Sequence, residues 1–120
     1  MINRTKTTHI ILHHSLSPDG IKRDWKGIKE YHLANGWEDV AYHYGIELIN
    51  KLYSVQIGRN VLVVGGHCKE GGMNNISIGV CFVGNFDKDV VPKEQWIVGL
   101  ELVKDLMNFY KIPVSNVKGH

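Results

Sequence analysis

The stretch Ile10-Ile11-Leu12-His13-His14 gives the clearest indication of fold near the start of this chain. Its isoleucine and leucine side chains predict a short buried strand over residues 8–13, which ends in a histidine. Because neighbouring side chains of a strand point to opposite faces, only one of His13 and His14 can face a given site. A second histidine, His120, follows a glycine in a distant part of the sequence. Two histidines presented in this way are the beginning of a metal site.

The composition is that of an ordinary globular domain. The 120 residues are 43% apolar and 22% charged, which is sufficient for one domain with its own core. The formal net charge is +2, and no cluster of lysine and arginine with interleaved aromatic residues occurs, so we expect no nucleic-acid partner. No apolar run approaches the length of a membrane span, and the first residues lack the long apolar stretch of a secretory signal. We therefore expect a monomer without a membrane partner, made in the cytoplasm without a signal peptide.

Strand and helix patterns alternate along the chain. Asp24 can cap a first helix, which the glycine of Asn35-Gly36 ends. Pro92 opens the clearest helix, whose apolar stripe includes Trp96 and Val103. Residues 58–76 are rich in glycine and are expected to be irregular. This order predicts the α/β fold class, with helices packed on a sheet, built from strands over residues 8–13, 40–49, 52–57, 76–82 and 114–117 and helices over residues 24–35 and 92–110.

Two of these strands, 40–49 and 52–57, are expected to form a hairpin. Strand alternation places Tyr42 and Tyr44 on one face of the first strand, with His43 on the other face. The last strand is expected to deliver His120 to the edge of the sheet.

The two cysteines, Cys68 and Cys81, are too few for a disulfide scaffold. Cys81 lies within an apolar run, which predicts a buried free thiol. Cys68 directly follows His67, and its role is left open by the sequence.

Among candidate catalytic groups, histidines are the best represented. A catalytic zinc ion needs three protein ligands and an open position for water, and neutral imidazoles suit it. The alternative for His13 is a core histidine with its hydrogen bonds satisfied. His67 lies in the glycine-rich segment, from which a side chain can reach a cleft, and Tyr42 has a hydroxyl group that can stabilise an oxyanion. No Gly-x-Ser-x-Gly motif and no obvious carboxylate dyad supports another kind of catalysis.

Six short motifs, in a fixed order, resemble those of the type 2 N-acetylmuramoyl-L-alanine amidases, a family that includes bacteriophage lytic amidases and animal peptidoglycan recognition proteins. Together they extend over about residues 8 to 120, essentially the whole chain. The motifs are Ile10 to Ser15, Tyr31 to Trp37, Asp39 to Tyr44, Gly66-His67-Cys68, Asn74 to Gly84, and Gly119-His120.

The resemblance implies a single domain with a mixed central β-sheet flanked by helices. It also implies that Zn²⁺ is the cofactor, that His13 and His120 are zinc ligands, and that Tyr42 is catalytic. His67 and Asn74 are placed beside the substrate, which is peptidoglycan or a muropeptide. The implied reaction is zinc-dependent hydrolysis of the amide bond between N-acetylmuramic acid and L-alanine.

The family pattern continues beyond the point where this sequence stops. In the family, a cysteine or aspartate ligand follows the Gly-His motif, so residues 1–120 are expected to be an amidase-like domain that lacks the C-terminal segment. Three interpretations follow. The chain is a truncated amidase, another group completes the metal site (His67, Cys68, the carboxylate of His120 or a second chain), or the domain only binds peptidoglycan.

The alternatives to an amidase are therefore a non-catalytic peptidoglycan-binding module and a truncated, inactive amidase. A more distant alternative is a regulatory protein that holds another protein through exposed residues such as Trp37. The missing signal sequence fits a phage or prophage lysis enzyme that a partner releases to the cell wall, and it fits equally an enzyme that recycles wall fragments in the cytoplasm.

Overall fold

Five strands form one mixed sheet in the order β3-β2-β4-β1-β5. The computed structural model describes residues 1–15, 25–87 and 90–120. Strand β4 pairs in parallel with β1 and β2, β5 pairs in parallel with β1, and only β2 and β3 run antiparallel, as a hairpin. The elements are β1 (His9–His14), α1 (Trp25–Ala34), β2 (Tyr44–Ile49), β3 (Leu52–Ile57), η1 (Glu70–Asn75), β4 (Ser77–Phe82), α2 (Lys93–Tyr110), η2 (Val114–Asn116) and β5 (Val117–Gly119).

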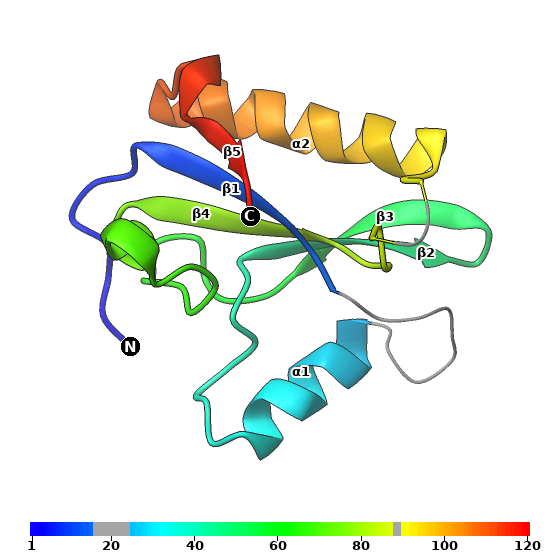
Figure 1. Cartoon of the computed structure of the whole chain (residues 1–120), viewed down its shortest axis with the longest axis horizontal. Helices are drawn as coiled ribbons and strands as arrows, with labels where there is room; N and C mark the ends of the chain where they lie inside the picture. Colours follow the sequence, from blue (N-terminus) through cyan, green and yellow to red (C-terminus); the bar gives the residue numbers. More distant parts are fainter. Residues whose placement is uncertain (16–24, 88–89) are drawn as a thin grey trace.

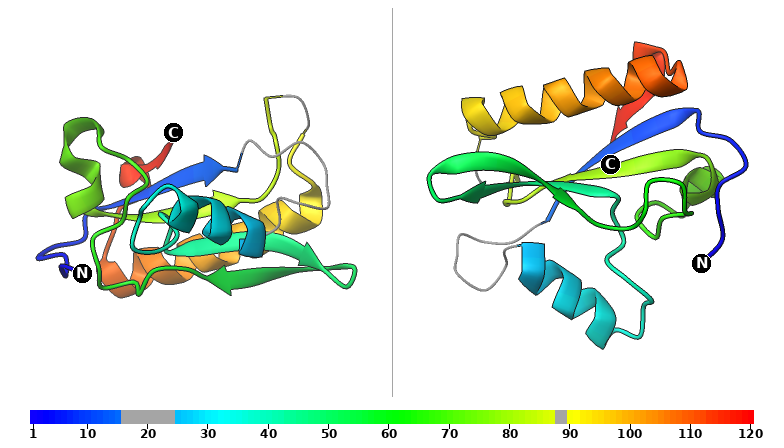
Figure 2. Two further views of the ribbon diagram at one scale, coloured as in Figure 1. Left: turned by 90° about the horizontal axis from the view of Figure 1, so that it is seen from below. Right: turned by 180° about the vertical axis from the view of Figure 1, so that it is seen from behind.

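The two helices lie on opposite faces of this sheet (Figures 1 and 2). The larger apolar cluster joins the sheet to α2, and Ile78, Val80 and Phe82 of β4 belong to it together with Val103 and Leu106 of α2. A smaller cluster joins the opposite face of the sheet to α1 and contains Trp25, Ile28, Val40 and Cys81. The predicted α/β class, with a mixed sheet flanked by helices in one domain, is confirmed.

Strand β4 is the centre of the sheet because all six of its residues are buried. Its alternation sends Ile78, Val80 and Phe82 toward α2, and Cys81 toward α1. Cys81 is a free thiol with 0% exposure, as the sequence predicted. The neighbouring strand β1 has the same alternation, with Ile10 in the cluster under α2. His13, three residues further along, therefore points to the α1 face of the sheet.

The first strand of the hairpin begins at Tyr44 instead of at residue 40. Backbone groups of the preceding residues bond to loops, since the Ala41 oxygen accepts from the Gly66 nitrogen at 3.0 Å and the Tyr42 oxygen accepts from the Arg59 nitrogen at 3.0 Å. Tyr42 packs against the cluster under α1, whereas Tyr44 packs against the cluster under α2. The prediction that these two tyrosines share one face of a strand was wrong.

Other boundaries differ in smaller ways. The segment from Val114 to Asn116 is a short 3-10 turn, with the Asn116 nitrogen donating to the Pro113 oxygen at 2.9 Å, and the last strand follows as Val117–Gly119. Residues 70–75, expected to be irregular, form η1, in which Gly71 and Gly72 have positive φ angles of 60° and 70°. The predicted cap Asp24 lies outside the described residues.

Candidate active site

His13 is the first of the candidate ligands, and it is placed by β1 on the α1 face of the sheet. It is 7% exposed, and its Nε2 is hydrogen bonded to Nδ1 of His67 at 2.8 Å. Burial, with smaller contributions from the neighbouring His120 and His14, lowers the pKa of His13 to about 4. The ring is therefore neutral at pH 7, which is the form that binds metal ions. With Nε2 engaged by His67, Nδ1 is the nitrogen that remains for an ion.

His14 is turned away from this site, as strand alternation predicted. Its Nδ1 accepts a hydrogen bond from the Phe86 nitrogen at 3.0 Å, and its ring stacks on that of Phe86. Phe86 packs against the cluster under α2, so His14 belongs to the other face of the sheet.

His120 reaches the same site from β5. This strand pairs with β1 so that Gly119 lies opposite Leu12, and the His120 nitrogen donates to the Leu12 oxygen at 3.0 Å. The pairing brings the imidazole rings of His13 and His120 to a centroid distance of 4.9 Å. The two histidines that the sequence predicted as zinc ligands are thus neighbours, although 107 positions separate them along the chain (120 − 13).

Tyr42 lies next to His13, with 5.2 Å between the two ring centroids. Its ring also lies 6.3 Å from that of Trp25 and 5.8 Å from that of His32. Burial raises the pKa of Tyr42 well above its usual value, and the neighbouring Cys81 thiol raises it further. The hydroxyl group therefore stays protonated and can donate a hydrogen bond.

His67 is hydrogen bonded to His13 and is itself only 8% exposed. Its second ring nitrogen, Nε2, is 3.3 Å from Oγ of Ser77. Gly79 of β4 makes room for the ring, since a Cβ atom there would lie 2.5 Å from Cγ of His67. Burial lowers the pKa of His67 to about 2, with His13 and His43 as further causes. His67 thus holds the His13 ring in one orientation from a buried position.

His43 and Arg4 extend this network, with Arg4 Nη1 3.1 Å from Nε2 of His43, and neither role was predicted from the sequence. The Gly79 nitrogen donates to Nδ1 of His43 at 3.0 Å, so in the neutral ring Nε2 carries the proton and donates to the Val63 oxygen at 2.7 Å. Burial, with smaller contributions from the positive charges of Arg4 and Arg59, lowers the pKa of His43 to about 4. His43 is 5.7 Å from His67 between ring centroids.

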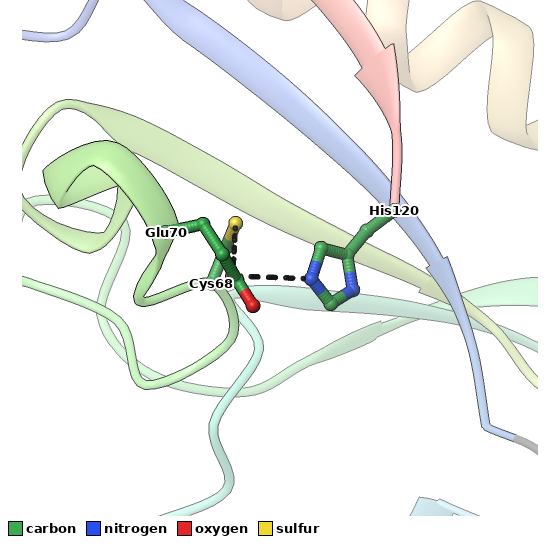
Figure 3. Close-up of side chains that lie close together, drawn as sticks. All are labelled: Cys68, Glu70 and His120. Carbon is green, nitrogen blue, oxygen red and sulfur yellow. Dashed lines mark hydrogen bonds and ion pairs between the residues drawn. The ribbon is translucent and has the colours of Figure 1, made fainter.

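The segment before β4 brings the Cys68 and Glu70 side chains close to His120 (Figure 3). Asn74 Oδ1 accepts from the Cys68 nitrogen at 2.7 Å and so fixes the loop. The Cys68 thiol donates to Oε2 of Glu70 at 3.4 Å, and the same oxygen is 3.3 Å from Nε2 of His120. The donor atoms of Cys68, Glu70 and His120 lie within 4.8 Å of one another, which makes them candidates for a metal ion.

The protonation of this loop follows from its hydrogen bonds. Burial raises the pKa of the Cys68 thiol, and the adjacent Glu70 carboxylate raises it further. Backbone hydrogen bonding lowers the pKa of Glu70, and the Cys68 and His120 side chains add to this effect. Cys68 is therefore a thiol, and Glu70 a carboxylate, when no cation is bound. From the sequence, Cys68 was included among the groups that could complete the metal site, but Glu70 was missed. The available signal was the position of Glu70, two residues after Cys68 in the same segment.

Solved structures with a similar fold come from two groups of proteins. The endolysin amidase LysCS from Clostridium intestinale URNW superposes with a TM-score of 0.79 at 28% identity, covering 96% of this chain and 69% of that one. Wild-type Drosophila PGRP-LB superposes with a TM-score of 0.76 at 21% identity, covering 100% of this chain and 76% of that one, which shows the shared fold alone. The chain thus has the fold that amidases and peptidoglycan-recognition proteins share.

Within this class, the chain belongs to the N-acetylmuramoyl-L-alanine amidase family, whose family model matches residues 3–120. The endolysin of Enterobacteria phage T3 is 38% identical over 84 residues, which cover 70% of this chain and 52% of the endolysin. The peptidoglycan-recognition protein LB of Drosophila melanogaster is 28% identical over 125 residues, which cover 93% of this chain and 50% of that protein. The chain thus spans about half the length of these curated relatives. Within the part of the chain that the structure describes, neither helix is of a length and apolarity suited to crossing a membrane.

Proposed function

We propose that this chain is the core of a zinc-dependent N-acetylmuramoyl-L-alanine amidase that acts on peptidoglycan or a muropeptide. The observation that supports this most directly is the convergence of His13, His120 and Tyr42, with ring centroids 4.9 Å and 5.2 Å from His13. Family membership supports the same reaction, and residues 1–120 are proposed as one amidase-like domain.

His13 and His120 supply two of the three protein ligands that a catalytic zinc ion takes. His13 is held neutral by burial, and His120 stands beside it with a half-exposed side chain. A zinc ion bound there would supply a Lewis acid for the scissile carbonyl and would lower the pKa of a bound water to about 7. His13 and His120 would hold the ion, and His67 would hold His13 through the hydrogen bond between the two rings.

Tyr42 is the proposed catalytic residue of this chain. Its hydroxyl is kept protonated by burial, so it can donate a hydrogen bond to the oxygen of the scissile carbonyl as negative charge develops there. His67 and Asn74 are proposed to form the wall beside the substrate. Asn74 is half-buried, and its side chain fixes the Cys68 backbone, so it would shape this wall through the loop.

The test is amidase activity of the zinc-loaded protein, measured as newly exposed L-alanine amino groups in purified peptidoglycan. Tyr42→Phe should lower kcat about 10²- to 10³-fold, the usual effect of removing one hydrogen-bond donor to an oxyanion. The matched control is Tyr31→Phe, because Tyr31 is 66% exposed on α1. Full activity in Tyr42→Phe would refute the catalytic role of this hydroxyl.

A non-catalytic peptidoglycan-binding module is the second candidate. It is favoured by the fact that His13 and His120 are two ligands, one fewer than the three protein ligands of a catalytic zinc site. The structural neighbours also include a complex of PGRP-LCa and PGRP-LCx with tracheal cytotoxin bound. Equal binding of a muropeptide with and without a chelator, with no cleavage, would establish this alternative.

The place of action is also a proposal. Several of the relatives are phage endolysins, which supports action on the cell wall after release by a partner. The alternative is cleavage of wall fragments in the cytoplasm, and a preference for soluble muropeptides over intact peptidoglycan would favour it.

A further inference from the structure

Three side chains with different donor atoms meet next to the end of β5. They are the Cys68 thiol, the Glu70 carboxylate and the His120 imidazole, and their donor atoms lie within 4.8 Å of one another (Figure 3). We propose that Cys68, Glu70 and His120 form a second binding site for Zn²⁺, whose ligand set shares only His120 with the His13–His120 pair. The proposal does not depend on amidase activity.

The distances between the donor atoms suit a tetrahedral ion. Zinc–sulfur bonds of about 2.3 Å and zinc–nitrogen or zinc–oxygen bonds of about 2.0 Å place sulfur and oxygen about 3.5 Å apart, and nitrogen and oxygen about 3.3 Å apart, at tetrahedral angles. The structure has 3.4 Å between Cys68 Sγ and Glu70 Oε2, and 3.3 Å between His120 Nε2 and the same oxygen. Two edges of a zinc tetrahedron are therefore matched, and the third, between Cys68 Sγ and His120 Nε2, is within 4.8 Å.

The backbone around each donor is fixed independently of any ion. Asn74 Oδ1 accepts from the Cys68 nitrogen at 2.7 Å, and the His120 nitrogen donates to the Leu12 oxygen at 3.0 Å. Glu70 begins η1, which turns at once through two glycines with positive φ angles. Because ligands held in place lose less conformational freedom on binding, this arrangement favours metal affinity.

The chemistry of the three donors selects the ion. A thiolate and an imidazole favour Zn²⁺ over Mg²⁺ and Ca²⁺, which prefer oxygen ligands. On binding, the thiol proton that Cys68 now donates to Glu70 would be released to solvent, and sulfur and carboxylate would both bind the ion. The Glu70 and His120 side chains are 76% and 45% exposed, so a fourth position is accessible to water.

Titration of the apo protein with Co²⁺ tests this site, because cobalt bound to a thiolate gives a charge-transfer band in the near ultraviolet. We expect this band in the unmodified protein and its loss in Cys68→Ser. The matched control is Cys81→Ser, which removes the other cysteine, a fully buried one on β4, and should keep the band. Circular dichroism of each variant confirms that it is folded.

Two further variants separate this site from the His13–His120 pair. Glu70→Gln should raise the Co²⁺ concentration at half-saturation of the band, whereas Glu30→Gln, on the exposed side of α1, should not. His13→Ala should keep the band, because His13 is outside the proposed ligand set.

The proposal is overturned if the unmodified protein gives no such band, if the band survives in Cys68→Ser, or if folded His13→Ala loses it. Since the readout needs no substrate, an inactive protein with a Cys68-dependent band would refute only the amidase function. An active enzyme without the band would refute only the second site.

Discussion

At the scale of single residues, the feature that stands out is a line of buried imidazoles behind the candidate ligand. His43 lies 5.7 Å from His67 between ring centroids, and His67 is hydrogen bonded to His13. All three have lowered pKa values, with burial as the largest cause. The Ser77 hydroxyl donates to the Met73 oxygen and therefore accepts from Nε2 of His67. Since a neutral imidazole has one donor and one acceptor nitrogen, Nδ1 of His67 then accepts from Nε2 of His13, which leaves Nδ1 of His13 unprotonated.

His67→Ala therefore tests whether His67 positions His13. We expect the zinc affinity to fall about 10- to 100-fold, the usual effect of removing a group that orients a metal ligand. Competition with a chromophoric chelator measures this affinity. The control is His9→Ala, which lies on β1, the strand that carries His13. If His67 instead contacts the substrate directly, the zinc affinity should stay unchanged and KM should rise.

His43 makes the stability of the fold depend on pH. Its folded-state pKa of about 4 lies below the ordinary value of 6.5, so the unfolded chain binds more protons between these values. The free energy of unfolding should therefore fall as the pH decreases from 6.5 to 4, with a slope from His43 of up to about 1.4 kcal/mol per pH unit. The groups that face its ring are Arg4, Arg59 and His67.

Urea denaturation of the metal-free protein at several pH values measures this slope. His43→Asn keeps an acceptor for the Gly79 nitrogen but does not titrate, so its slope should be shallower by the His43 contribution. An unchanged slope in this variant would show that other groups carry the pH dependence.

At the scale of elements, α2 packs closely on the centre of the sheet through a glycine. A Cβ atom at Gly99 would lie 2.3 Å from Cζ of Phe82, which is buried in β4. Gly99→Ala should therefore destabilise the protein by about 1–3 kcal/mol through overpacking, although alanine is the better helix former. Lys104→Ala, on the exposed side of the same helix, is the control, and a stabilised Gly99→Ala variant in urea denaturation would contradict this packing.

The elements also show what sequence patterns can and cannot predict. Hydrophobic runs predicted β1, β4 and α2 closely, because the apolar residues of these elements indicate burial on one or both faces. The position of Tyr42 was predicted on the wrong face, because alternation assumes that the strand continues from residue 40. Hydrogen bonds from Gly66 and Arg59 to the backbone of residues 41 and 42 end the regular pairing there, and these partners lie in a distant loop.

At the scale of the whole molecule, the sheet order assembles the site. β1 lies between β4 and β5, so residues near the start and end of the chain meet beside a loop from its middle. His13 and His120 could be predicted together from a family resemblance. The approach of Glu70 to His120 could not, because it depends on where the first residue of η1 lies relative to the residue that follows β5 (Figure 3), across 50 residues of sequence.

Because the last strand has only three residues, the zinc ion should stabilise the whole fold by connecting β5 to β1. An ion present at 100 times its Kd adds about 2.7 kcal/mol to the folded state if the unfolded chain does not bind it. We therefore expect zinc to raise Tm, and a chelator to reverse the increase, in a thermal denaturation series.

His120→Ala should abolish this zinc-dependent increase in Tm, since His120 belongs to both ligand sets. Lys118→Ala, an exposed residue of the same strand, should retain the increase and controls for disturbance of β5. The same increase in His120→Ala and in the unmodified protein would place the ion elsewhere. A loss in Lys118→Ala as well would mean that the integrity of the strand, and not the imidazole, determines the effect.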